Sequence, residues 1–162
     1  MKKPTIYLYV ITALLFFIGC DNDDSPTGHA DPNKVYIERV TISNVPFTNE
    51  NGQPWDEFSG PDVFFDISSF SNTFHTADPY FGDATPSDLP LTWNLSQIVM
   101  IPDWSETFYI RLWDFDDQSN DYIGPVLFEI DNIIEEENGY PESINIQNDD
   151  ASIVVNIGFR WM

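Results

Sequence analysis

Aspartates cluster at two places in this 162-residue chain, each beside a hydrophobic or aromatic run that is typical of a β-strand. In the first cluster, Asp56 and Asp62 flank a Ser-Gly-Pro turn before the run VFF. In the second, Asp114, Asp116 and Asp121 follow the run FYIRLW. Ca²⁺ takes about six to eight oxygen ligands, and a loop with alternating carboxylates can direct several of them at one point. Because the same carboxylates would repel one another without a cation, the clustering predicts a Ca²⁺ site.

Two other interpretations of these aspartates are an EF-hand and a structural role in turns. An EF-hand is excluded, because counting from Asp114 the sixth residue is Ser119 rather than Gly and the twelfth is Pro125 rather than Glu. Asp also caps turns through its side chain, so all five aspartates could be ordinary turn residues with no metal.

Together the two clusters resemble the calcium loops of the C2 domain. The segment DEFSGPDVFF matches a first loop with two aspartates six residues apart before an aromatic-rich strand. Residues of the second segment match the third C2 loop in order, namely Asp114, Asp116, Ser119, Asn120, Asp121 and Gly124. Weaker likenesses at VYIERVTISNVP, Trp93-Asn94 and Trp161 extend the resemblance over most of residues 34–162.

The resemblance implies an eight-stranded antiparallel β-sandwich with Ca²⁺ held between loops at one end. Its implied ligands are Asp56, Asp62, Asp114, Asp116 and Asp121. The third loop is one residue shorter than usual, which leaves the number of ions open. The chain also lacks the lysine-rich strand with which some C2 domains bind acidic lipids, and this argues against an anionic phospholipid partner.

Aromatic residues flank the acidic loops. As candidate ligand contacts we single out Phe58, Phe115 and Ser119. Trp55 and Tyr122 fit better as core aromatics at strand ends, and the sequence does not decide which aromatic rings are exposed.

The elements that must position these residues are short strands separated by Pro, Gly, Asn and Asp. A period of two, as at Val35/Ile37 and along Ile153 to Phe159, indicates strands with one buried face. With a weak strand in Thr73–Tyr80, one helical turn in Ile133–Asn138 and a long loop from Asp78 to Leu91, the pattern predicts an all-β, C2-like sandwich. The predicted strands are Val35–Val45, Val63–Phe70, Trp93–Ile101, Thr107–Trp113, Val126–Ile130, Ser143–Ile146 and Ser152–Trp161.

The N-terminus has the features of an export signal. Lys2 and Lys3 precede an apolar run over 6–18, which is too short to span a bilayer as a mature helix. Gly19-Cys20 then resembles a bacterial lipobox, with bulky Phe17-Ile18 as the departure, and Cys20 is the only cysteine. We therefore predict a signal peptide over 1–19, a lipidated Cys20 with a flexible acidic tether over 20–33, and the sandwich domain over 34–162; an uncleaved signal anchor is the alternative.

Charge and composition limit the partners. The chain has 27 acidic and six basic residues, and two of the basic ones lie in the predicted signal. No basic patch for nucleic acid can form from the remainder, whereas divalent cations would neutralise the excess charge. The 42% hydrophobic and 15% aromatic content excludes a disordered acidic tail.

We find no GxSxG, P-loop or HExxH motif, and His29 and His75 are isolated, so the sequence predicts a protein that is not an enzyme. It is expected to be lipid-anchored in the cell envelope, at the outer membrane. Asp21, Asp23 and Asp24 resemble the surface-export signal of Bacteroidota lipoproteins, or serve as a solvating tail. The alternative to calcium binding is a surface sandwich that binds a glycan or protein, with structural aspartates.

Overall fold

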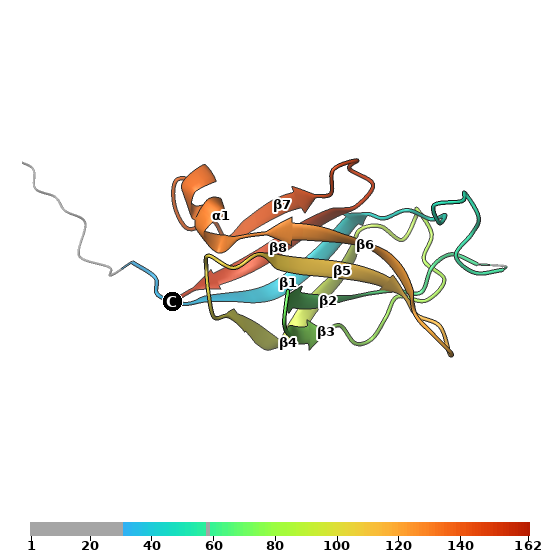
Figure 1. The fold of residues 1–162 in the computed structure, drawn as a ribbon, viewed down its shortest axis with the longest axis horizontal. Helices are drawn as coiled ribbons and strands as arrows, with labels where there is room; N and C mark the ends of the chain where they lie inside the picture. The colour runs from blue at the N-terminus through green and yellow to red at the C-terminus, as the bar shows by residue number, and fades with distance from the viewer. Residues whose placement is uncertain (1–30, 58) are drawn as a thin grey trace, which may run out of the picture. The chain divides into compact units, whose positions relative to one another are not determined.

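The computed structural model describes residues 31–57 and 59–162. The predicted signal peptide, Cys20, the tether up to residue 30 and Phe58 lie outside the described residues. The compact unit runs from Pro32 to Met162. Its two ends lie side by side, because the backbone N–H groups of Asn33 and Lys34 both donate to the carbonyl oxygen of Met162, at 2.9 and 3.0 Å (Figure 1).

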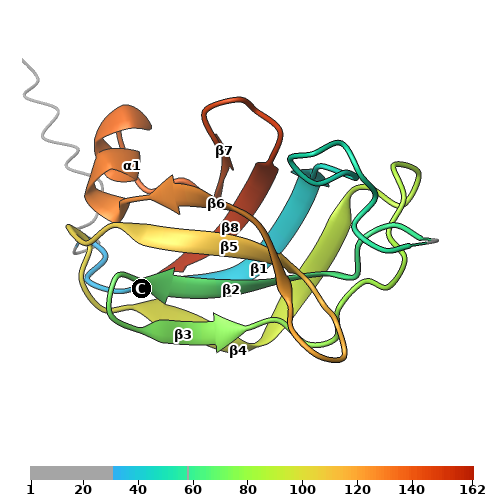
Figure 2. The same cartoon turned by 45° about the vertical axis from the view of Figure 1, so that its right-hand side comes forward.

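The described residues form eight strands in two four-stranded antiparallel sheets that pack face to face (Figure 2). One sheet has the order β4-β1-β8-β7 and the other the order β3-β2-β5-β6. This architecture confirms the predicted all-β, eight-stranded antiparallel sandwich. The elements are β1 (Val35–Asn44), β2 (Val63–Ser69), β3 (Thr73–Thr76), β4 (Leu91–Ile101), β5 (Phe108–Asp114), β6 (Asp121–Phe128), α1 (Ile130–Glu136), β7 (Ser143–Gln147) and β8 (Val154–Trp161).

The core lies between the sheets and follows from the alternation of side chains along the strands. Every second residue of β5 is buried, and Phe108, Ile110 and Leu112 point into the core with no exposed surface. In the facing sheet, Val155 and Ile157 of β8 are equally buried. Fully burying side chains of this kind contributes about 1.5–3 kcal/mol each, so the alternation is enough to determine which face of each strand turns inward.

Strand β2 differs from the others because all seven of its residues are buried. On its outer face the carboxylate of Asp66 pairs with Arg111 of the adjacent β5, at 2.8 Å between Nε and Oδ1. The indole N–H of Trp113 donates to the other carboxylate oxygen at 2.8 Å. Side chains of β5 therefore cover β2 from outside, and they hold this central strand in register with the strand that carries Asp114.

Strand β6 begins five residues earlier than the sequence pattern predicts. Asp121 and Gly124 are typical turn residues and interrupt the alternation, yet both pair with β5, opposite Asp114 and Leu112. A bulge between Leu112 and Trp113 and a positive φ of 154° at Gly124 accommodate the irregular start.

The loops after β1, β3, β5 and β7 gather at one end of the sandwich, and α1 lies at the other end (Figures 1 and 2). Among the described residues, no helix has the length and apolar character needed to cross a membrane.

Candidate metal centre

Antiparallel pairing of β2 with β5 brings the two predicted acidic segments together. Val63, the first residue of β2, pairs with Asp114, the last residue of β5. The loop that precedes β2 and the loop that follows β5 therefore lie at the same end of the sheet. The backbone N–H of Asp62 donates to Oδ1 of Asp114 at 2.6 Å. The N–H of Phe115 donates back to the carbonyl oxygen of Asp62 at 2.9 Å. Two segments 52 residues apart in the chain are thus directly bonded at the loop end.

Asp114 is a buried carboxylate with an incomplete set of partners. Its exposed fraction is 0%, and Oδ2 has no hydrogen-bond partner among the described residues. Burial raises the pKa of Asp114 to about 6, the N–H of Asp62 opposes the rise, and repulsion from Asp56, Asp116 and Asp62 adds to it. A buried carboxylate oxygen without a donor costs free energy unless a proton or a cation satisfies it.

Asp116, like Asp114, is repelled by other predicted aspartates. Burial raises its pKa, and repulsion from Asp121, Asp56, Asp62 and Asp117 raises it further. The loop that carries Asp116 is shaped by Asn120, whose side-chain oxygen accepts the N–H of Asp116 at 3.2 Å. The five predicted aspartates, within or at the ends of two loops, therefore lie near enough to repel one another.

Over residues 31–57 and 59–162, no three or more His, Cys, Asp and Glu side chains converge as they would around a metal ion. Because carboxylates repel one another, electrostatics favours side chains that stand apart. The donor set still fits a hard cation in two respects: it consists of oxygens, and it contains the unpartnered buried Oδ2 of Asp114. A Ca²⁺ ion would satisfy that oxygen and offset part of the negative charge of the five aspartates.

A third loop, between β3 and β4, supports the site through a contact that the sequence analysis missed. The N–H of Asp83 donates to Oδ1 of Asp62 at 2.6 Å, and Asp83 has a positive φ of 51°. At Gly60, an added Cβ would lie 1.9 Å from the carbonyl oxygen of Ala84, so the two loop backbones touch. The sequence predicts a long loop from Asp78 to Leu91, but the contact of Asp83 with Asp62 appears only in the folded chain.

Aromatic rings stand beside the acidic group at the surface. Phe115 is 38% exposed and stacks on Tyr80 of the β3–β4 loop, at 4.7 Å between ring centroids. Ser119 is also exposed, in the β5–β6 loop. Tyr122 is 48% exposed, so its expected place in the core is wrong, because at the start of β6 it faces outward beside Trp113. Trp55 is partly buried, and its indole N–H donates to the carbonyl oxygen of Pro46 at 2.8 Å.

Comparisons by sequence give no relatives: no family model and no curated protein matches this chain. Comparisons by structure give several. The fold resembles human GIVD cytosolic phospholipase A2, with a TM-score of 0.55 and 13% identity over 83% of this chain. It also resembles the calcium-bound pair of C2 domains from Extended-Synaptotagmin 2, with a TM-score of 0.50 and 16% identity over 80% of this chain. A C2 domain protein from Ramazzottius varieornatus matches with a TM-score of 0.46 and 19% identity, covering 79% of this chain and 86% of that one.

The domain therefore has a C2-like fold, as its acidic motifs predict. The chain spans 17% of the phospholipase chain and 46% of the Extended-Synaptotagmin 2 chain that it resembles. At these identities the likeness concerns the fold, and the chemistry of the loop end has to be argued from this chain's own residues.

Proposed function

We propose that this protein is a non-enzymatic, lipid-anchored protein of the cell envelope whose C2-like domain binds Ca²⁺ at its loop end. Asp56, Asp62, Asp114, Asp116 and Asp121 would hold the ion, and Cys20 would carry the anchor. The observation that carries the proposal is the buried carboxylate of Asp114, whose Oδ2 is unpartnered within a group of repelling aspartates.

Binding of Ca²⁺ would order the surface around the ion. The positive charge of the ion would reduce the repulsion among the aspartates at the β1–β2 and β5–β6 loops. Asp62 would transmit this order to the β3–β4 loop, since its side chain accepts the N–H of Asp83. The exposed pair of Phe115 and Tyr80 would then belong to a metal-stabilised binding surface. Affinity is expected in the range of extracellular modules, about 10⁻⁴–10⁻³ M, because two exposed loops form most of the site.

Thermal unfolding of the chain without residues 1–20, in EDTA and in a Ca²⁺ titration, tests the metal site. If the ion binds only the folded state, saturation at 100 times Kd adds about 2.7 kcal/mol of stability. The informative variant is Asp114→Asn, which keeps an oxygen for the N–H of Asp62 but removes the charge. It should unfold at the same temperature with and without Ca²⁺.

A matched control is Asp131→Asn, which removes an exposed carboxylate from α1 at the other end of the domain. This variant should keep the full Ca²⁺ response. If Asp114→Asn is still stabilised by Ca²⁺, or if Asp131→Asn is not, the stabilisation comes from general neutralisation of an acidic surface. No response in the unmodified chain would refute the calcium site itself.

A further inference from the structure

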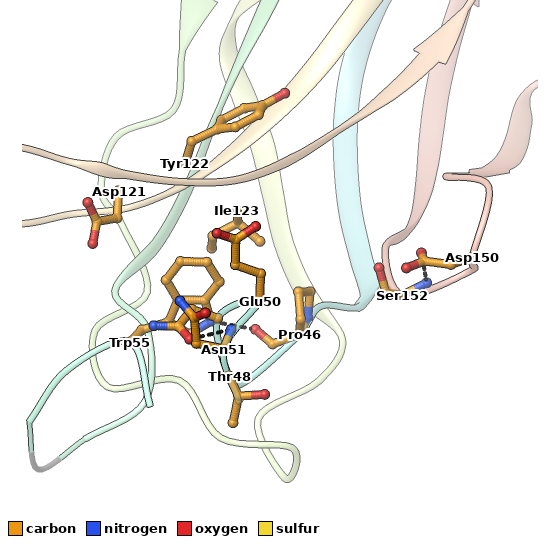
Figure 3. Close-up of a pocket in the computed structure, with 11 residues that line it drawn as sticks. Pro46, Thr48, Glu50, Asn51, Trp55, Asp121, Tyr122, Ile123, Asp150 and Ser152 are labelled. Atoms are coloured by element: carbon orange, nitrogen blue, oxygen red, sulfur yellow. Dashed lines mark hydrogen bonds between the residues drawn. The ribbon is translucent and has the colours of Figure 1, made fainter. Parts of the chain in front are cut away.

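A cavity of about 540 Å³ opens beside the acidic group, between three loop-end segments (Figure 3). One wall is the β1–β2 loop with Trp55, the second is the start of β6 with Ile123, and the third is the β7–β8 loop with Ser152. Its size is typical of small-ligand sites, which range from about 300 to 1,000 Å³.

Hydrogen bonds within the β1–β2 loop shape the first wall. The carbonyl oxygen of Pro46 fixes the indole of Trp55. The side-chain oxygen of Asn49 accepts the N–H groups of Asn51 and Gln53, at 3.0 and 3.1 Å. Because these bonds close the turn on itself, the indole presents a fixed apolar surface to the cavity, with little conformational entropy left to lose on binding.

Hydrogen bonds also hold the third wall, the β7–β8 loop. Oδ1 of Asp150 accepts the N–H of Ser152 at 2.9 Å. The side chain of Asn148 donates to the hydroxyl of Ser152 and accepts the N–H of Ile153, both at 2.9 Å. The side-chain amide of Asn44, at the end of β1, donates to the carbonyl oxygen of Ala151 at 3.1 Å and ties this loop to the sheet.

The charged side chains of the cavity disfavour an anionic ligand. No Lys, Arg or His is among the described residues that line it, and its charged side chains are Glu50, Asp121 and Asp150. A phosphate, sulfate or carboxylate would meet only like charge there. The three carboxylates are also spread around the cavity, with Asp121 on one side, Glu50 in the middle and Asp150 on the other side, so they do not converge on one small cation (Figure 3).

We infer that this cavity binds a neutral oligosaccharide. Such a ligand carries many hydroxyl donors for separated carboxylate and amide acceptors, and its C–H faces pack against an indole. Glu50 and Asn51 are exposed and would accept from or donate to sugar hydroxyls, while Trp55 would carry the stacked ring. The inference does not depend on Ca²⁺, since only Asp121 is shared with the proposed metal group.

The test is an array of neutral and anionic oligosaccharides probed with the chain without residues 1–20 in EDTA, followed by calorimetric titration of the strongest neutral binder. Trp55→Ala and Glu50→Gln should each lower the affinity for that oligosaccharide about tenfold or more. Trp55→Ala removes the stacked ring, and Glu50→Gln removes a charged hydrogen-bond acceptor. Glu136→Gln on α1 is the matched control and should bind like the unmodified chain.

Because Trp55→Ala could disturb its loop, Trp55→Phe serves as a second variant: it should retain part of the affinity and remove the change in tryptophan fluorescence on binding. Thermal unfolding of each variant shows whether it is folded. No binding of any neutral oligosaccharide would overturn the inference, as would an equal preference for anionic glycans or full affinity in Trp55→Ala and Glu50→Gln. Any of these results leaves the calcium site untouched, because the array contains EDTA.

Discussion

Replacing Asp114 with asparagine in the metal-free protein removes a buried charge and keeps the side chain's shape. The pKa of Asp114 is raised from 3.8 to about 6, so the folded chain holds this proton more tightly than the unfolded chain does. The contribution of Asp114 to stability is therefore greatest at low pH and is lost as pH rises from about 4 to about 7. At 1.36 kcal/mol per pKa unit, the loss is about 3 kcal/mol at neutral pH.

The variant Asp114→Asn does not titrate at this position and should escape the loss. In EDTA, the two proteins should have similar stability near pH 4, and the variant should be more stable by about 2–3 kcal/mol near pH 7. For a domain of this size that corresponds to roughly 10 °C in Tm. Urea or thermal denaturation across this pH range measures the difference.

In this pH range, two other described groups have shifted pKa values: that of Asp116 is raised by burial and by repulsion from neighbouring aspartates, with the same sign as Asp114, and that of His75 is shifted with the opposite sign. Burial lowers the pKa of His75, so its contribution to stability is lost as pH falls. Since His75 and Asp116 are present in both proteins, subtracting one stability curve from the other leaves the contribution of Asp114 together with its coupling to Asp116. A variant that is no more stable than the unmodified chain at neutral pH would refute the buried, repelled state of Asp114.

Three further outcomes follow from the structure and the sequence. Gly60→Ala should lower the free energy of unfolding, measured in urea, by about 1–3 kcal/mol or more, because the new Cβ would lie 1.9 Å from the backbone oxygen of Ala84. Unchanged stability would contradict this contact between the loops. Arg111→Leu should cost roughly 2 kcal/mol by the same assay, less than the ~3–5 kcal/mol of a fully buried pair, because Asp66 loses its cation but the guanidinium is partly exposed. Cys20→Ala should abolish incorporation of a labelled fatty acid into the protein, and label that the variant retains would contradict lipidation at Cys20.

Local patterns in the sequence determine much of this fold. The alternation of apolar residues in β1 and β8 sets their buried faces, because a strand places successive side chains on opposite sides. Pro, Gly and Asp between the runs mark most of the strand ends. The start of β6 is different, since Asp121 and Gly124 look like turn residues and become strand only through pairing with β5.

Some features of the acidic site are likewise visible in the sequence, and others depend on the fold. The spacing of Asp56, Asp62, Asp114 and Asp116 is visible in the sequence, because each pair lies within one short segment. That Asp114 is buried with an unpartnered oxygen depends on the pairing of β2 with β5, which connects residues 52 positions apart. The same holds for the bond from Asp83 to Asp62 and for the cavity beside them, which three separate loops enclose. Contacts between distant segments are set by how the sheets pack, and no local pattern of residue types encodes that packing.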